Sequence, residues 1–197
     1  MQPIESEEQL NESVNYIDYT TKTIYIYDEI DNELACNVSI ALQKFKRSYI
    51  MEGEIRKPVT IKINSNGGSM CDTLAIVSDI LNFYDNWLSK DEPHIITDIT
   101  GIAYSGAAMI AIAGHSVRMS QLGMMMLHYP LWADGTKSLV EHEIDTKITR
   151  EHFERAMSLL FKATNLTIQK FKVLANNKEV YLSPKEALKY NLIDNIY

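Results

Sequence analysis

The sequence predicts an α/β fold with a mostly parallel sheet, and two strand–turn–helix units carry this prediction. In the first unit, residues 58–64 alternate apolar and polar side chains like a half-buried strand, and a helical pattern through Ile76 and Ile80 follows. In the second unit, a β-branched run at 94–100 leads through a tight turn into an apolar helix of small residues within 101–114, with Ser105 at its head. Repeated strand–helix units favour parallel strands joined by crossover helices.

The other elements are predicted from local patterns. In chain order they are a strand at 23–27, a helix at 33–49, strands at 117–119 and 124–127, a long helix at about 138–163, and a final helix after Ser183. The final helix opens with the capping box Ser183-Pro184-Lys185-Glu186, which has proline at its first position. The long helix carries Val140, Ile144 and Ile148 at fourfold spacing beside a strongly charged face.

Composition indicates a compact cytoplasmic protein. The 197 residues suit one domain, at 21–197, after an acidic, polar segment at 1–20 that we expect to be mobile unless a partner orders it. A hydrophobic share of 46% argues against disorder, and a net charge of −7 argues against nucleic acid as a general partner. The sequence has no apolar run near the roughly 18 residues of a membrane span. It has no secretory signal either.

The two cysteines, Cys36 and Cys71, are too few for a disulfide framework or a zinc cage, and no HExxH motif is present. We therefore expect neither a metal nor a cofactor, and both cysteines as small buried residues. Cys71 follows a Gly-Gly turn and is a minor alternative nucleophile.

Ser105 is the main candidate nucleophile, because it lies where the β-branched run turns into the small-residue helix. A serine at such a turn presents its hydroxyl to a crevice, and the free N–H groups of the first helical turn can stabilise an oxyanion. The alternative is a helix kept slim for close packing.

A turn of paired glycines lies upstream, at Ser65-Asn66-Gly67-Gly68-Ser69. Paired glycines let the backbone approach a ligand and point its N–H groups outward. We assign the oxyanion hole to the N–H groups of Gly67, in this turn, and Gly106, directly after the nucleophile. The alternative is an ordinary glycine-rich turn, and no phosphate-loop signature follows it.

His128 is the candidate general base, because it ends the apolar strand at 124–127 just before Pro130. Imidazole is the side chain best suited to take a proton from serine near neutral pH. A histidine of the core or its rim is the alternative.

Together these motifs resemble the Clp-type serine peptidases, the proteolytic subunits of ATP-dependent Clp machines. The resemblance covers the chain from about Lys22 to Tyr197. It rests on four segments in family order, at 63–68, 101–114, 127–130 and 181–194.

The resemblance implies a crotonase-like spiral of ββα units, in which the helix at 138–163 projects as a handle and interlocks two rings. It implies polypeptide substrates and further copies of the same chain, in heptameric rings stacked as a tetradecamer. It also implies an AAA+ unfoldase as a partner. The family's docking pocket for that partner uses outward-facing aromatic side chains, whereas this chain has Thr60 and Lys62 there. An apolar docking pocket is therefore not expected, or the partner differs.

The acid of the catalytic triad is the main departure. Counting back from Tyr181-Leu182-Ser183 places the family's aspartate at Glu179. Glutamate serves this role in some hydrolases, but its extra methylene changes its reach. Asp194, which aligns with a structural aspartate of the family, is the other candidate, and a solvated surface charge is the plain alternative for Glu179.

The expected function is therefore a serine endopeptidase that cleaves unfolded polypeptides inside a ring, with Ser105, His128 and Glu179 as its triad. A catalytically weak or inactive scaffolding subunit is the first alternative, because of Glu179. A crotonase-type acyl-CoA enzyme is the second, because that superfamily shares the spiral and uses backbone oxyanion holes. Ser105 and His128 together disfavour it, since acyl-CoA enzymes need no such pair.

Overall fold

The computed structural model describes residues 16–51, 57–83, 94–130, 139–175 and 178–197. Most of the segment expected to be mobile, and the start of the predicted long helix, lie outside these residues. The predicted domain boundary after residue 20 falls within a hairpin, because Ile17 and Asp18 pair with Ile24 and Thr23. The described fold therefore begins before residue 21.

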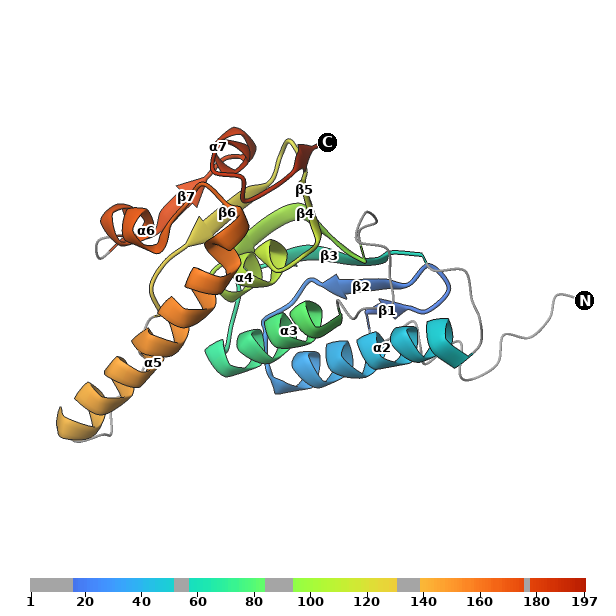
Figure 1. Ribbon diagram of the computed structural model, residues 1–197, viewed down its shortest axis with the longest axis horizontal. Coiled ribbons are helices and arrows are strands. Elements are labelled where there is room, and N and C mark those ends of the chain that lie inside the picture. The colour runs from blue at the N-terminus through green and yellow to red at the C-terminus, as the bar shows by residue number, and fades with distance from the viewer. Residues whose placement is uncertain (1–15, 52–56, 84–93, 131–138, 176–177) are drawn as a thin grey trace, which may run out of the picture.

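One sheet of eight strands organises the molecule (Figure 1). Its main path is β1 (Ile17–Asp18), β2 (Thr23–Ile26), β3 (Val59–Ser65), β4 (Ile95–Tyr104), β5 (Ser116–Met119) and β8 (Asn195–Ile196), with β6 (Met124–Leu127) and β7 (Val180–Leu182) branching from β4. All neighbours pair in parallel except β1 with β2 and β6 with β7. The predicted parallel α/β architecture is confirmed.

The sheet divides along β4, which pairs with a different strand along each half of its length. The first half of β4 pairs with β5, from Ile96 to Ile99, whereas its last residues, Ile102–Tyr104, pair with β6. The strand continues past the β-branched run at 94–100 as far as Tyr104, and the helix begins just after Ser105, the residue predicted to lie at its head. Pairing with β6 keeps the chain extended up to the residue before Ser105.

The helices of the described residues are α2 (Asn32–Met51), α3 (Met70–Phe83), α4 (Gly106–Ile112), α5 (Leu139–Leu160), the 3₁₀ turn η2 (Phe161–Ala163), α6 (Ile168–Leu174) and α7 (Pro184–Lys189). Helices α2, α3 and α4 lie along one face of the sheet, and the other helices lie toward its β6–β7 end (Figure 1). Every residue of α4 is buried. On β3, Val59, Ile61 and Ile63 are fully buried while Thr60 and Lys62 face the other side, as the alternation predicts. The capping box of α7 is confirmed, because Ser183 accepts from the Glu186 N–H and the Glu186 carboxylate accepts from the Ser183 N–H.

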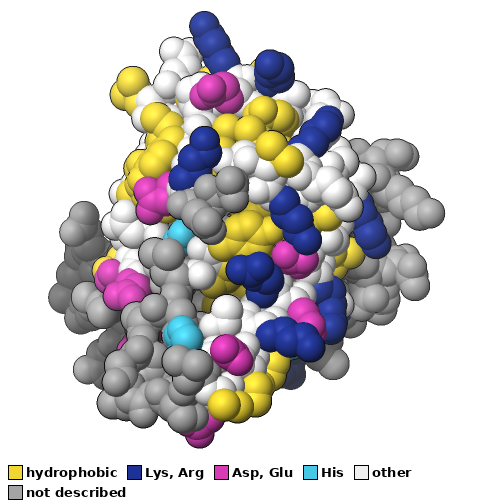
Figure 2. All heavy atoms as spheres, turned by 90° about the vertical axis from the view of Figure 1, so that its left-hand side faces the viewer, with side chains coloured by type: hydrophobic (Ala, Val, Ile, Leu, Met, Phe, Trp, Pro, Cys, Tyr) yellow, Lys and Arg dark blue, Asp and Glu magenta, His cyan; other side chains and the backbone are white. Residues whose placement is uncertain are grey.

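The long helix α5 projects away from the sheet (Figure 1). Its C-terminal part packs on the core through the buried residues Met157 and Leu160. The apolar stripe nearer its N-terminus is exposed, with Val140, Ile144 and Ile148 at 63%, 52% and 47% of full accessibility. Figure 2 shows the face of the molecule toward which α5 projects, and hydrophobic side chains lie open to solvent there between Lys and Arg side chains.

The structure also bears on the two cysteines and on membrane-spanning helices. Cys36 and Cys71 are both exposed, so the expectation that they are buried is wrong. Each lies on a helix position that faces away from the sheet. Within the described ranges, no helix has both the length and the apolar character needed to cross a bilayer.

Candidate active site

Ser105 occupies a strained turn between β4 and α4. Its backbone has φ 55° and ψ −121°, a conformation that non-glycine residues rarely adopt and that tends to mark functional positions. Hydrogen bonds hold the turn on both sides: the Ser105 N–H donates to the Met126 carbonyl at 2.8 Å, and its carbonyl accepts from Ala108 and Met109 at the start of α4. The sharp turn from strand to helix presents the hydroxyl at the end of the sheet, like a nucleophile elbow.

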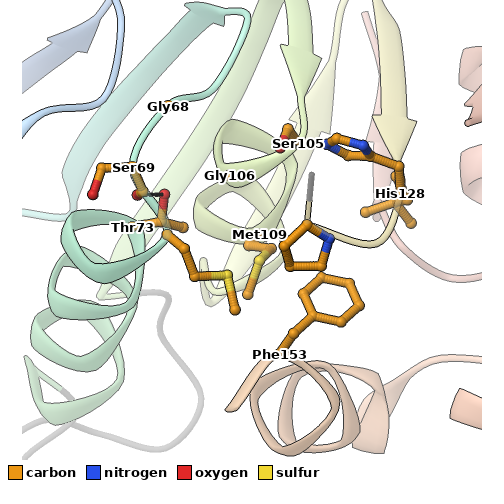
Figure 3. Close-up of a pocket in the computed structure, with 11 residues that line it drawn as sticks. Gly68, Ser69, Thr73, Ser105, Gly106, Met109, His128 and Phe153 are labelled. Carbon is orange, nitrogen blue, oxygen red and sulfur yellow. Dashed lines mark hydrogen bonds between the residues drawn. The ribbon is translucent and has the colours of Figure 1, made fainter. Parts of the chain in front are cut away.

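His128 lies within hydrogen-bond reach of this hydroxyl, because it follows β6 as Ser105 follows the neighbouring β4. Tyr104 and Met126 are paired across the two strands. The His128 Nε2 atom is 2.7 Å from Ser105 Oγ (Figure 3). Burial lowers the pKa of His128, and the negative charge of Glu179 raises it by less. The imidazole is therefore neutral at neutral pH and ready to accept a proton.

A cavity of about 290 Å³ opens beside this pair. Ser105 and His128 line one end of it, Met109 and Phe153 line its middle, and Ser69 and Thr73 lie on the side away from His128 (Figure 3). A cavity that is partly apolar and has a few polar groups suits a peptide side chain next to a bond under attack.

The structure corrects the choice of Gly67 as an oxyanion donor. The Gly67 N–H already donates to Ser65 Oγ at 3.1 Å. The neighbouring Gly68 forms a parallel bridge with Ile30, in which the Ile30 N–H donates to Gly67 and the Ser69 N–H donates to Ile30. The N–H of Gly68 itself therefore points away from Ile30, and Gly68 lines the cavity.

Gly106 remains the second candidate donor. Gly106 begins α4, so its N–H has no acceptor within the helix, and it too lines the cavity. Gly68 and Gly106 are thus the glycines whose N–H groups are available at the cavity. The bond from Gly67 to Ser65 Oγ and the bridge to Ile30 distinguish Gly68 from Gly67, and Ile30 is far away in the sequence.

Gly67 has a different role, because it makes the close approach to the nucleophile. Its φ is +97°, and an added Cβ would lie 2.7 Å from the Tyr104 carbonyl oxygen and 2.9 Å from Ser105 Cβ. No larger residue fits without displacing the turn around Ser105.

Glu179 lies opposite His128 by strand register. Leu127 pairs with Val180 in the antiparallel β6–β7 ladder, so the next pair outward is His128 with Glu179. Residues directly opposite on such a ladder place their side chains on one face, about 5 Å apart at Cβ. Within the described residues, however, the Glu179 carboxylate bonds to the Tyr181 hydroxyl at 2.7 Å, and no hydrogen bond joins it to His128.

Asp194 is not at the site. Its carboxylate accepts from the Val117 N–H at 2.7 Å, and its own N–H donates to the Val117 carbonyl. These bonds fasten the C-terminal segment to β5, so the structure gives Asp194 a structural position. Cys71 is exposed on the first turn of α3 and does not line the cavity.

The described residues offer no candidate metal site. Among the described residues, no three His, Cys, Asp or Glu side chains converge as metal ligands do.

Comparison with known proteins identifies a family for this chain. The Clp protease family model matches residues 5–197. The ATP-dependent Clp protease proteolytic subunit of Mesostigma viride is 27% identical over 186 residues, which cover 90% of this chain and 72% of that protein. A mutant of ClpP1 from Listeria monocytogenes superposes with a TM-score of 0.67 at 23% identity over 95% of both chains, which supports the same fold. Because the family match spans nearly the whole sequence, this chain belongs to the Clp protease family.

Proposed function

We propose that this chain is a serine endopeptidase subunit that cleaves unfolded polypeptides or peptides within a ring assembly. The observation that carries the proposal is the 2.7 Å contact between Ser105 Oγ and His128 Nε2, two residues that line the same cavity. A nucleophile within hydrogen-bond reach of a neutral imidazole is the arrangement that acyl transfer requires.

The proposed reaction has two steps. The Ser105 hydroxyl attacks the peptide carbonyl while His128 Nε2 takes its proton, and the N–H groups of Gly68 and Gly106 stabilise the oxyanion. His128 then gives the proton to the leaving amine, which frees the first product and leaves an acyl group on Ser105. A water molecule, activated by His128, releases the second product and restores the serine.

A fluorophosphonate probe tests this proposal. We expect covalent labelling of the assembled protein at Ser105, located by mass spectrometry of its peptides. In a structure of the adduct, the phosphonyl oxygen should lie within hydrogen-bond distance of the Gly68 and Gly106 N–H groups. Absence of labelling, or labelling at another residue, would contradict the proposal.

Assembly into rings is part of the proposal. The apolar stripe of Val140, Ile144 and Ile148 on α5 is exposed in the isolated chain, and contact between copies would bury it. We propose heptameric rings stacked in pairs, with an ATP-dependent unfoldase as the source of substrate. At Thr60 and Lys62 the outward side chains of β3 are polar, but Lys62 Nζ lies 5.6 Å from the centroid of the Tyr25 ring on the neighbouring β2. The unfoldase would therefore meet a surface that combines polar side chains with an aromatic ring.

Light scattering at micromolar concentration tests the assembly. We expect a mass of many copies, and substitution of Ile144 by aspartate should shift the mass toward smaller species because it places a charge in the buried contact. A monomeric mass together with full peptidase activity would contradict the ring proposal.

A catalytically weak subunit is the second candidate function. The observation that favours it is the bond from Tyr181 to Glu179, which leaves the imidazole without a hydrogen-bonded acid among the described residues. Slow probe labelling, with scaffolding of active copies, would support this alternative. No described feature favours an acyl-CoA enzyme.

A further inference from the structure

Tyr181 is the residue that holds the carboxylate next to His128. Its hydroxyl donates to Glu179 Oε2 at 2.7 Å. Sequence reasoning used Tyr181 only to set the register of the closing segment. Its hydroxyl is therefore a feature of the site that the reaction proposed above leaves unexplained.

The ring of Tyr181 is itself fixed by the strand next to the nucleophile. Tyr181 pairs with Met126 on β6, and Met126 pairs with Tyr104 on β4, so the three residues form one row across the sheet. The rings of Tyr104 and Tyr181 meet edge to face, with centroids 5.7 Å apart at 90°. Tyr104 directly precedes Ser105, and the hydroxyl of Tyr181 is thus placed relative to the nucleophile.

Glu179 and Tyr181 also share a face of the chain. They are two residues apart on an extended segment, so their side chains point to the same side. The β6–β7 register, continued one residue past Leu127 and Val180, brings Glu179 opposite His128, and the charge of Glu179 acts on the imidazole. A carboxylate accepts several hydrogen bonds, so Oε2 can remain with Tyr181 while Oε1 takes the Nδ1–H of His128.

Glutamate has one more rotatable bond than the aspartate expected at this position, and Glu179 is exposed to solvent. A free glutamate would sample several rotamers, and ordering it beside His128 would cost entropy at each turnover. A hydroxyl that already holds one oxygen reduces this cost.

We propose that Tyr181 is a positioning residue, whose hydroxyl fixes the longer Glu179 carboxylate where it can orient the His128 imidazole. This inference rests on the proposed peptidase function. It adds a residue that acts through Glu179 and does not touch the substrate.

The hydroxyl keeps its proton over the working range of pH. The hydrogen bond to Glu179 is the largest cause of a raised pKa at Tyr181, followed by burial and the charge of Glu179. Tyr181 therefore donates at neutral and at mildly alkaline pH. Glu179 is the charged group that acts on His128, so the pH dependence of His128 reports where this carboxylate lies.

The test is Tyr181→Phe in the full-length, assembled protein, which removes the hydroxyl and keeps the ring against Tyr104. We expect kcat for peptide hydrolysis to fall about tenfold with little change in KM, the size of one lost hydrogen bond to a charged group. The acid limb of kcat/KM should move to lower pH. When the carboxylate is no longer held nearby, it raises the pKa of His128 less, and the base stays unprotonated to lower pH.

A double-mutant cycle separates positioning from a merely structural role. In a Glu179→Gln background, Tyr181→Phe should cost little further activity, because Tyr181 acts through the carboxylate. The matched control is Tyr190→Phe, which removes a tyrosine hydroxyl at the C-terminal end of α7. It should leave kcat and the pH profile unchanged.

Three results would overturn the inference: an unchanged kcat and pH profile in Tyr181→Phe, an equal loss in both backgrounds, or a rise in kcat. A rise would mean that the hydroxyl withholds Glu179 from His128. Failure of the proposed function would give a different result. The parent chain would then not be labelled at Ser105, and both proposals would be wrong.

Discussion

Replacement of Ser105 by alanine should lower peptide turnover by about 10⁴-fold to 10⁶-fold, the loss typical of removing a serine nucleophile. Without the hydroxyl no acyl-enzyme can form, and the cavity and oxyanion donors alone retain only a small residual rate. Peptide turnover and fluorophosphonate labelling should both fall to background, since both depend on the same oxygen.

Protein stability should change little in this variant. Alanine keeps the Cβ atom of serine, so the cost of the positive φ at this position is similar for both residues. The backbone bonds to Met126, Ala108 and Met109 do not involve the side chain. Ser78→Ala, which removes an exposed hydroxyl on α3, is the matched control and should retain parental turnover. If Ser105→Ala cleaves peptides as fast as the parent, Ser105 is not the nucleophile.

The strand–turn–helix units were predictable because their signals are local. The alternation at 58–64 became β3 with its apolar side chains buried, and the capping box at Ser183 became the start of α7. Placing Ser105 at a turn between strand and helix needed only the change of pattern around it, and Ser105 does lie at such a turn.

The end of β4 was not predictable in this way. Residues 101–104 fall in the predicted turn before the small-residue helix, yet pairing with β6 keeps them extended. This pairing joins segments more than twenty residues apart, and no local pattern encodes it. The same holds for the short strands β1, β7 and β8, which have too few residues for an alternation and exist because a partner strand adjoins them.

The oxyanion donors show a finer limit. Sequence spacing identified the Gly-Gly turn but could not distinguish Gly67 from Gly68, because their N–H groups point in different directions. That difference depends on Ser65 Oγ and on the bridge to Ile30. Likewise, the register anchored at Tyr181 led to Glu179, but the hydroxyl that holds Glu179 was missed. The spacing of two residues on a strand was the available signal for it.

Replacement of Glu179 by glutamine is expected to lower peptide turnover by about 10² to 10⁴, the upper value being typical of an acid-to-amide change in a serine-protease triad. Glutamine keeps the shape but loses the negative charge that stabilises the imidazolium, and its amide can favour the wrong tautomer of His128. Because Glu179 is exposed, water screens its charge, which favours the lower part of this range.

The pH profile gives an independent sign. Loss of the Glu179 charge removes the effect that raises the pKa of His128 and leaves the lowering by burial. The base then remains unprotonated to lower pH, so the acid limb of kcat/KM should move to lower pH while the plateau falls. An unchanged limb would mean that the carboxylate does not act on His128.

Comparison of Glu179→Gln with Glu179→Asp, at matched oligomeric state, separates charge from reach. Aspartate keeps the charge at the register position opposite His128, but its shorter side chain gives up the bond to Tyr181. We expect it to retain turnover within about tenfold of the parent, since that bond is worth one charge-assisted contact. If both variants match the parent, Glu179 is a surface charge, and the site works as a Ser105–His128 dyad. If aspartate is as slow as glutamine, the reach supplied by glutamate and held by Tyr181 matters as much as the charge.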